Sequence, residues 1–222
     1  MNRLAGSIAL AASLLTAAPP AWAGFTVPAN APGQYAPRDE CAQLPGAAPF
    51  LARLKAAVRK RDAAAFAALT SPEIILDFGG GGGREAVIER LGPGSKLWGE
   101  LDRILALGCA LDAETGGLVM PWFFAQDLGD ADPYSTNVTL GAAVPLRERP
   151  SRKGKLVTLL NWQLVVIREI EAADPGYETV AVIDSDFEGH VRSGKLRSQL
   201  DYRLVVEKTG DEWLVTAFLA GD

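Results

Sequence analysis

The sequence predicts an α+β protein, with a helix-rich α+β N-terminal half followed by an all-β C-terminal half. In the first half, apolar residues recur at the spacing of amphipathic helices. Beyond residue 137 the chain changes to short β-prone runs, each bounded by Gly, Pro, Asp or Ser. The polar, Asp-rich stretch QDLGDADPYSTN at 126–137 separates the helix-rich pattern from the β-prone pattern, and we interpret it as a linker.

The chain opens with the features of a secretory signal peptide, which we assign to residues 1–23. Arg3 supplies positive charge, residues 4–18 are apolar, and an A-x-A site ends at Ala23. No later apolar run approaches the roughly 20 residues that a transmembrane helix needs, so we expect no stable membrane span. The predicted location is periplasmic or secreted.

Residues 24–40 are rich in Pro, Gly and Ala and predict an irregular lead-in before an α+β domain at 41–126. Apolar residues at helical spacing predict a first helix around Phe50, and Asp62 is placed to cap a second, short helix. The elements expected after these are a strand at 73–78, a helix at 84–91, an amphipathic helix at 97–105 and a strand at 117–125.

In the all-β half, residues 197–222 are assigned to a C-terminal β-hairpin that turns at the sequence TGD. Whether this hairpin packs on the first half is left open. The β-prone runs of this half lie at 156–167, 178–184, 190–196, 202–208 and 212–219.

The chain contains two cysteines, Cys41 and Cys109, and an even count in an exported protein predicts one disulfide. The loop that it would close spans 109 − 41 = 68 positions. Chain entropy assigns such a loop about 4 kcal/mol of stabilisation. Two separate buried thiols are the alternative.

Two sequence patterns in the all-β half carry a resemblance. AAVPLRERPSRKGKLVTLL contains an apolar strand, Leu-Arg-x-x-Pro-Ser, a charged loop and a second strand, and YETVAVIDSDFEGHVRSGKL contains an aromatic-x-x-Val strand, a Gly-x-Val strand and a closing Leu. Together, over residues 138–196, they resemble the bacterial SH3-like domain (SH3b), and the resemblance implies a small SH3-like β-barrel. The matching residues are Leu146, Arg147, Pro150, Ser151, Tyr177, Val180, Gly189, Val191 and Leu196.

The chain departs from the SH3-like pattern at two places. His190 stands where the family has Trp or Tyr, and Asn161-Trp162 replaces a glycine turn, so the family's ligand is not carried over. In the first half, two helices with a central Asp, a strand, a further helix and a late hairpin are similar to nuclear-transport-factor-like folds.

Five consecutive glycines, Gly79 to Gly83, lie between the expected strand and helix. A dinucleotide fingerprint requires glycine where Arg84 stands, and no Gly-Lys pair is followed by Ser or Thr as in a P-loop. Two interpretations stay open: a turn free of side chains, or an anion site at the helix N-terminus assisted by Arg84.

The sequence lacks residues that the known motifs for metal binding and catalysis require. DSDFEG at 184–189 begins like a calcium loop, but Lys195 stands where the loop needs Glu. The chain has one histidine, His190, and no G-x-S-x-G. We predict that the protein is not an enzyme and binds no metal and no cofactor. The possibility that two carboxylates cleave a glycosidic bond stays open. The net charge of −5 argues against nucleic acid.

We therefore expect an exported, non-catalytic protein whose SH3-like module binds cell-wall peptide or an envelope protein. The alternatives are a purely structural or assembly protein of the envelope and a protein associated with a cell-wall hydrolase. The ligand face is expected at the basic loop 147–155, the turn between the two strands after it, and the strand beyond. Its residues are Tyr177, Trp162, Arg147, Arg149, Arg152 and His190.

The signal-peptide assignment predicts the mature N-terminus. Export with cleavage after Ala23 should leave Gly24 as the first residue, because the A-x-A site precedes that bond. Intact-mass measurement of protein from its native compartment checks this. Mature soluble protein that still carries Met1 would refute the assignment.

Overall fold

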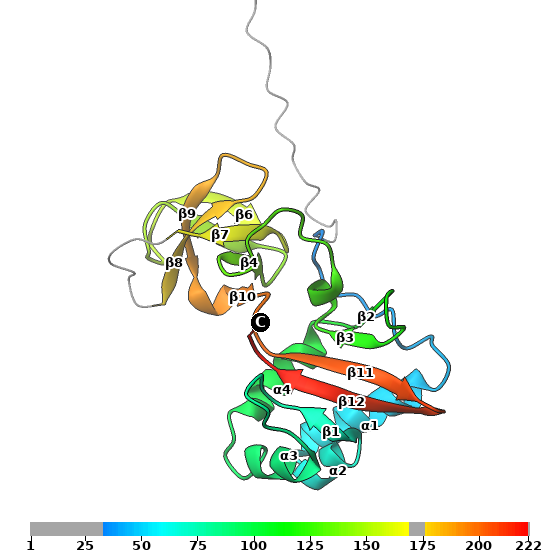
Figure 1. Cartoon of the computed structure of the whole chain (residues 1–222). Helices are drawn as coiled ribbons and strands as arrows, with labels where there is room; N and C mark the ends of the chain where they lie inside the picture. The colour runs from blue at the N-terminus through cyan, green and yellow to red at the C-terminus, as the bar shows by residue number, and fades with distance from the viewer. Residues whose placement is uncertain (1–32, 169–175, 222) are drawn as a thin grey trace, which may run out of the picture. The chain divides into compact units, whose positions relative to one another are not determined.

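The computed structural model describes residues 33–168 and 176–221, whose strands form two β-sheets (Figure 1). The expected signal peptide, residues 1–23, and the lead-in up to residue 32 lie outside the described residues. The described residues belong to one compact unit.

The first sheet has the strand order β1-β12-β11-β3-β2. Strand β12 pairs with β1 in parallel, and the other neighbours are antiparallel. The C-terminal hairpin of β11 and β12 therefore lies in the middle of a sheet whose other strands come from the first half (Figure 1). The strands are β1 (Thr70–Ile75), β2 (Ala110–Leu111), β3 (Leu118–Met120), β11 (Arg203–Thr209) and β12 (Glu212–Leu219).

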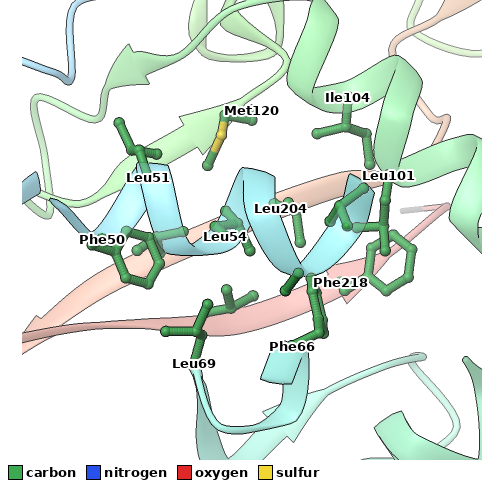
Figure 2. Packing of buried hydrophobic residues seen from close by; sticks show 14 of the residues in the cluster. Phe50, Leu51, Leu54, Phe66, Leu69, Leu101, Ile104, Met120, Leu204 and Phe218 are labelled. Carbon is green, nitrogen blue, oxygen red and sulfur yellow. The ribbon is translucent and has the colours of Figure 1, made fainter. Parts of the chain in front are cut away.

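Four helices pack with this sheet: α1 (Ala47–Lys60), α2 (Ala63–Ala67), α3 (Arg84–Arg90) and α4 (Leu97–Ala106). The Asp62 carboxylate accepts a hydrogen bond from the Ala65 N–H and caps α2, as the sequence indicates. Apolar faces of α1, α2 and α4 bury against the central strands β11 and β12. Figure 2 shows this core, which includes Phe50, Leu54, Phe66, Leu101, Leu204 and Phe218.

The predicted fold class, with a helix-rich N-terminal half, is wrong. The described residues contain twelve strands in two sheets and four α-helices of 14, 5, 7 and 10 residues. Strands β2 and β3 have two and three residues, too short for a periodic pattern, and β11 and β12 arrive from the far end of the chain. The expected strand at 117–125 ends at Met120, and the 3-10 helix η1 (Trp122–Ala125) follows it.

The second sheet has the strand order β10-β4-β7-β8-β9-β5-β6, with antiparallel neighbours throughout. One face buries Val144, Leu146, Leu160, Val165, Val180, Val182 and Val191. Its elements are β4 (Thr136–Thr139), β5 (Val144–Arg147), β6 (Leu156–Leu160), β7 (Leu164–Ile167), β8 (Tyr177–Val182), β9 (Glu188–Arg192), the 3-10 helix η2 (Ser193–Lys195) and β10 (Leu196–Ser198).

A buried arginine joins β10 to α4. Arg197 is only 4% exposed, and its guanidinium lies 3.4 Å from the Glu100 carboxylate and donates to the Tyr202 carbonyl at 2.7 Å. A buried cation is tolerated only when it is paired, so this contact links the second sheet firmly to the first.

The two cysteines form a disulfide, so the predicted pairing is confirmed. The Cα atoms of Cys41 and Cys109 lie 5.8 Å apart, and both side chains are buried. Beside the bridge, the Cys109 N–H donates to the Arg38 carbonyl and the Glu40 N–H to the Cys109 carbonyl. The disulfide fits an oxidising, extracytoplasmic location. Among the described helices, none has the length and apolar character to cross a membrane.

Removing the disulfide should destabilise the fold strongly. Replacing both Cys41 and Cys109 by Ala frees a loop of 68 positions in the unfolded chain. The free energy of unfolding should fall by about 4 kcal/mol. Urea unfolding followed by tryptophan fluorescence measures the change, and reduced wild type should match the double variant. An unchanged unfolding midpoint would contradict the prediction.

Candidate functional site

Four side chains form a row across the second sheet on the face opposite its core, here called the outer face. Arg147 on β5 pairs with Leu156 on β6 and with His190 on β9, and His190 pairs with Thr179 on β8. Directly opposed residues on neighbouring strands point to the same side. Their chain neighbours alternate into the core, as Leu146 does.

Hydrogen bonds hold this row in place. The Arg147 Nη1 donates to the Gly154 carbonyl at 2.7 Å, which fixes the guanidinium against the β5–β6 loop. The Thr179 hydroxyl lies 3.1 Å from Nδ1 of His190. Tyr177 and Arg192, two residues farther along β8 and β9, are paired with each other and share this face. The face thus combines cations, an imidazole and a phenol.

The β5–β6 loop adds exposed positive charge next to the row. Arg149, Arg152 and Lys153 are exposed, and the loop encloses a hollow of about 370 Å³ lined by Arg149, Pro150, Ser151, Lys153 and Gly154. The Lys155 ammonium donates to Glu148 at 2.8 Å, and this hydrogen bond raises the pKa of Lys155. The segment 144–160 holds five basic residues and one acidic residue, a charge of +4. The remainder of the chain therefore carries −5 − 4 = −9.

Trp162 belongs to a different cluster. It lies in the turn between β6 and β7, is half-buried, and packs against the apolar cluster that contains Tyr35 and Trp122. Its carbonyl accepts a hydrogen bond from the Tyr35 N–H at 3.2 Å. The structure therefore brings Arg147, His190 and Tyr177 to one face, with Arg149 and Arg152 in the adjoining loop, and places Trp162 under the lead-in.

Sequence reasoning missed Leu156 and Leu159, which are 45% and 52% exposed on β6. Leu159 faces outward because its neighbour Leu160 is buried, and a register shift between Leu146 and Arg147 brings Leu156 to the same outer face. The sequence carries no signal for this shift. A scan against protein-family models and a search of curated proteins both find no match for the chain.

The glycine run is a turn closed by its own carboxylate. Asp77 accepts hydrogen bonds from the N–H groups of Gly79 and Gly81, both at 2.9 Å, and pairs with Arg90. A Cβ atom on Gly82 would overlap the Ile74 carbonyl, so that position requires glycine. Because Asp77 already occupies these amides, the structure favours the turn over the anion site.

Arg84 also takes a structural position. Its guanidinium donates to the Thr70 carbonyl at 3.0 and 2.6 Å, and so it ties the start of α3 to β1. It does not assist an anion at the glycine turn.

Two further hollows have no catalytic set. One, of about 650 Å³, lies beside Arg61, Ile88 and Trp98, and there the Arg61 guanidinium is held by Asp102 and the Trp98 carbonyl. The other, of about 390 Å³, includes Tyr35, Asp127 and Asp184. Burial is the main cause that raises the pKa of Tyr35, and the negative charges of the two carboxylates add to it. In the described part of the chain, no group of three or more His, Cys, Asp or Glu residues could hold a metal ion.

The Asp77 turn should give a pH-dependent contribution to stability. In the folded state the pKa of Asp77 lies below its ordinary 3.8. The main cause is the hydrogen bond that its carboxylate accepts from Arg90, and the second is the hydrogen bond from the Gly81 N–H. The stabilisation is therefore present above pH ~4 and is lost as pH falls through the lower, folded pKa. Asp77→Asn should lower the urea midpoint at pH 7 and converge with wild type in acid.

A matched control separates this effect from general charge loss. Asp211→Asn removes an exposed carboxylate from the β11–β12 turn and should leave the midpoint unchanged at both pH values. A constant difference between Asp77→Asn and wild type across the acid range would show that the turn is not held by the ionised carboxylate.

Proposed function

We propose that the protein is an exported, non-catalytic binding protein of the cell envelope, located in the periplasm or secreted. Its second sheet binds carboxylate-bearing cell-wall peptide or an envelope protein through the outer face. The observation that carries this proposal is the cationic β5–β6 hairpin beside the row of Arg147 and His190. The resemblance of residues 138–196 to bacterial SH3-like domains supports a binding role.

The chemistry of the outer face suits anionic ligands. A guanidinium forms two parallel hydrogen bonds with a carboxylate, and Arg147 is already oriented by the Gly154 carbonyl. Exposed Arg149 and Arg152 attract anions over a longer range, an effect that salt screens. Tyr177 offers apolar ring area at small entropic cost. The segment 144–160 carries a charge of +4 and the remainder of the chain −9. This difference in charge orients an anionic partner toward the outer face.

The two cysteines and the histidine already have partners within the fold. Both cysteines are joined in the disulfide, so neither supplies a thiolate. His190, the one histidine of the sequence, lies between Thr179 and Arg147 on the sheet, and its Nδ1 is 3.1 Å from the Thr179 hydroxyl. This arrangement supports a binding surface.

The alternative is a purely structural or assembly protein of the envelope. The position of Trp162 favours it, because that ring packs in the cluster with Tyr35 and so contributes to stability. Binding by the outer face does not require Trp162.

Retention on purified peptidoglycan tests the proposal. Wild type should be retained at low salt and released as salt rises, because the attraction is screened. Arg149→Gln with Arg152→Gln should raise the dissociation constant about tenfold, equal to ~1.4 kcal/mol. Arg59→Gln with Lys60→Gln removes the same charge from α1, at two exposed positions, and should bind like wild type.

Folding of each variant is checked by circular dichroism before binding is measured. If wild type is not retained at low salt, wall binding is rejected and a protein partner becomes the better candidate. If both double variants bind like wild type, the β5–β6 loop is not the binding surface.

A further inference from the structure

We infer that the open edge of β6 binds an extended, acidic peptide segment of a partner protein, which adds a strand to the second sheet. This inference rests on the proposed function and specifies its partner and its mode of binding. It follows from a β6 edge that pairs with no other described strand, exposed leucines on that edge, and a cationic loop at its end.

Strand β6 is the last in the sheet order and pairs with β5. Each of the other three edges contacts further described residues. Along β1, Ile75 bridges to Gly82, and beside β2, Asp39 bridges to Cys109. At β10, Arg197 is buried against α4. An uncovered edge presents unpaired N–H and C=O groups, which an added strand can pair.

The register shows which backbone groups of β6 face outward. Pro145 stands opposite Leu159, and proline has no N–H. The two residues therefore cannot exchange the two hydrogen bonds of a bonded antiparallel pair, so theirs is the non-bonded pair. The N–H and C=O of Leu159 consequently point away from β5, toward the open edge.

Exposed leucines add apolar contact on the same strand. Leu156 and Leu159 oppose Arg147 and Pro145, which lie two residues apart on β5, so both leucines share the outer face. They are 45% and 52% exposed. Edge strands usually carry features that prevent pairing with other chains, and apolar side chains favour such pairing.

The positive charge of the β5–β6 loop favours an acidic peptide. The loop that leads into β6 carries exposed Arg149, Arg152 and Lys153, and a strand laid along β6 reaches this loop. Acidic side chains on the added strand pair with these cations, whereas basic ones are repelled. A lipid surface is less suited, because the hydrocarbon of a membrane offers no partner to the backbone groups of Leu159.

The first experiment tests charge. The probe is a fluorescent peptide of about ten residues, alternating glutamate and valine, and its match has lysine in place of glutamate. Fluorescence anisotropy at low salt should detect binding of the glutamate peptide and not of the lysine peptide. Arg152→Glu with Lys153→Glu should raise the dissociation constant about tenfold or more, from loss of attraction. Arg59→Glu with Lys60→Glu changes the charge equally and should stay within about twofold of wild type.

The second experiment tests the backbone. Leu159→Pro removes the outward N–H and leaves the hydrogen bonds to β5 in place, so it should abolish peptide binding. Leu159→Thr also removes apolar area but keeps the N–H, and should retain most of the binding. If Leu159→Pro does not fold, hydrogen exchange on wild type replaces it. Saturating peptide should then slow exchange of the Leu159 amide.

The outcomes separate this inference from the proposed function. If the charge variant loses binding while folded Leu159→Pro binds like wild type, strand addition is overturned and the cationic binding face stands. If wild type binds both peptides equally or neither, acidic recognition at this edge is overturned. Binding to vesicles of phosphatidylglycerol without binding to the glutamate peptide would assign the hairpin to a lipid surface and overturn the peptide partner.

Discussion

The parallel pairing of β12 with β1 is the contact on which the rest of the fold depends. It brings Val215 next to Thr70, and β11, the other strand of the hairpin, then supplies the position against which β3 pairs. Such distant residues meet only after a large loop is closed, which costs conformational entropy. The apolar faces of α1 and α4 repay this cost by burying against the hairpin. The second sheet is therefore an insertion between β3 and β11 of one continuous structure.

This insertion explains how the candidate site is positioned. Strand β10 leads directly into the C-terminal hairpin, and Arg197 ties it to Glu100 on α4. That end of the second sheet is therefore linked to the helices of the first. The opposite end, β6, is left as the open edge, and the β5–β6 loop that adjoins it carries the exposed cations. The connectivity therefore links the β10 end of the sheet to α4, and the sequence of the β5–β6 loop places the cations at the other end.

The candidate site was partly predictable. The basic loop is visible in the sequence, and the SH3-like resemblance selected Arg147, Tyr177 and His190, which the structure gathers on one face. The shared face of Leu156 and Leu159 was not predictable. Residues three apart lie on opposite faces of a regular strand, and only the register shift between Leu146 and Arg147 brings Leu156 to the face of Leu159. Trp162 was grouped with Tyr177 from its place in the sequence, although its actual neighbours include Tyr35 from the lead-in.

Local features were determined by the sequence itself, since they depend on residues a few positions apart. The helical spacing in α1 and α4, the Asp62 cap and the hairpin turn at TGD are of this kind, and the cysteine count predicted the disulfide. The tertiary structure alone decided the fold class, the sheet that receives the C-terminal hairpin, and the ion pair between Asp77 and Arg90 beside the glycine turn. The first two depend on pairing between strands far apart in the chain. The third depends on where the Arg90 side chain lies once α3 has packed, and no sequence pattern encodes such long-range or packed contacts.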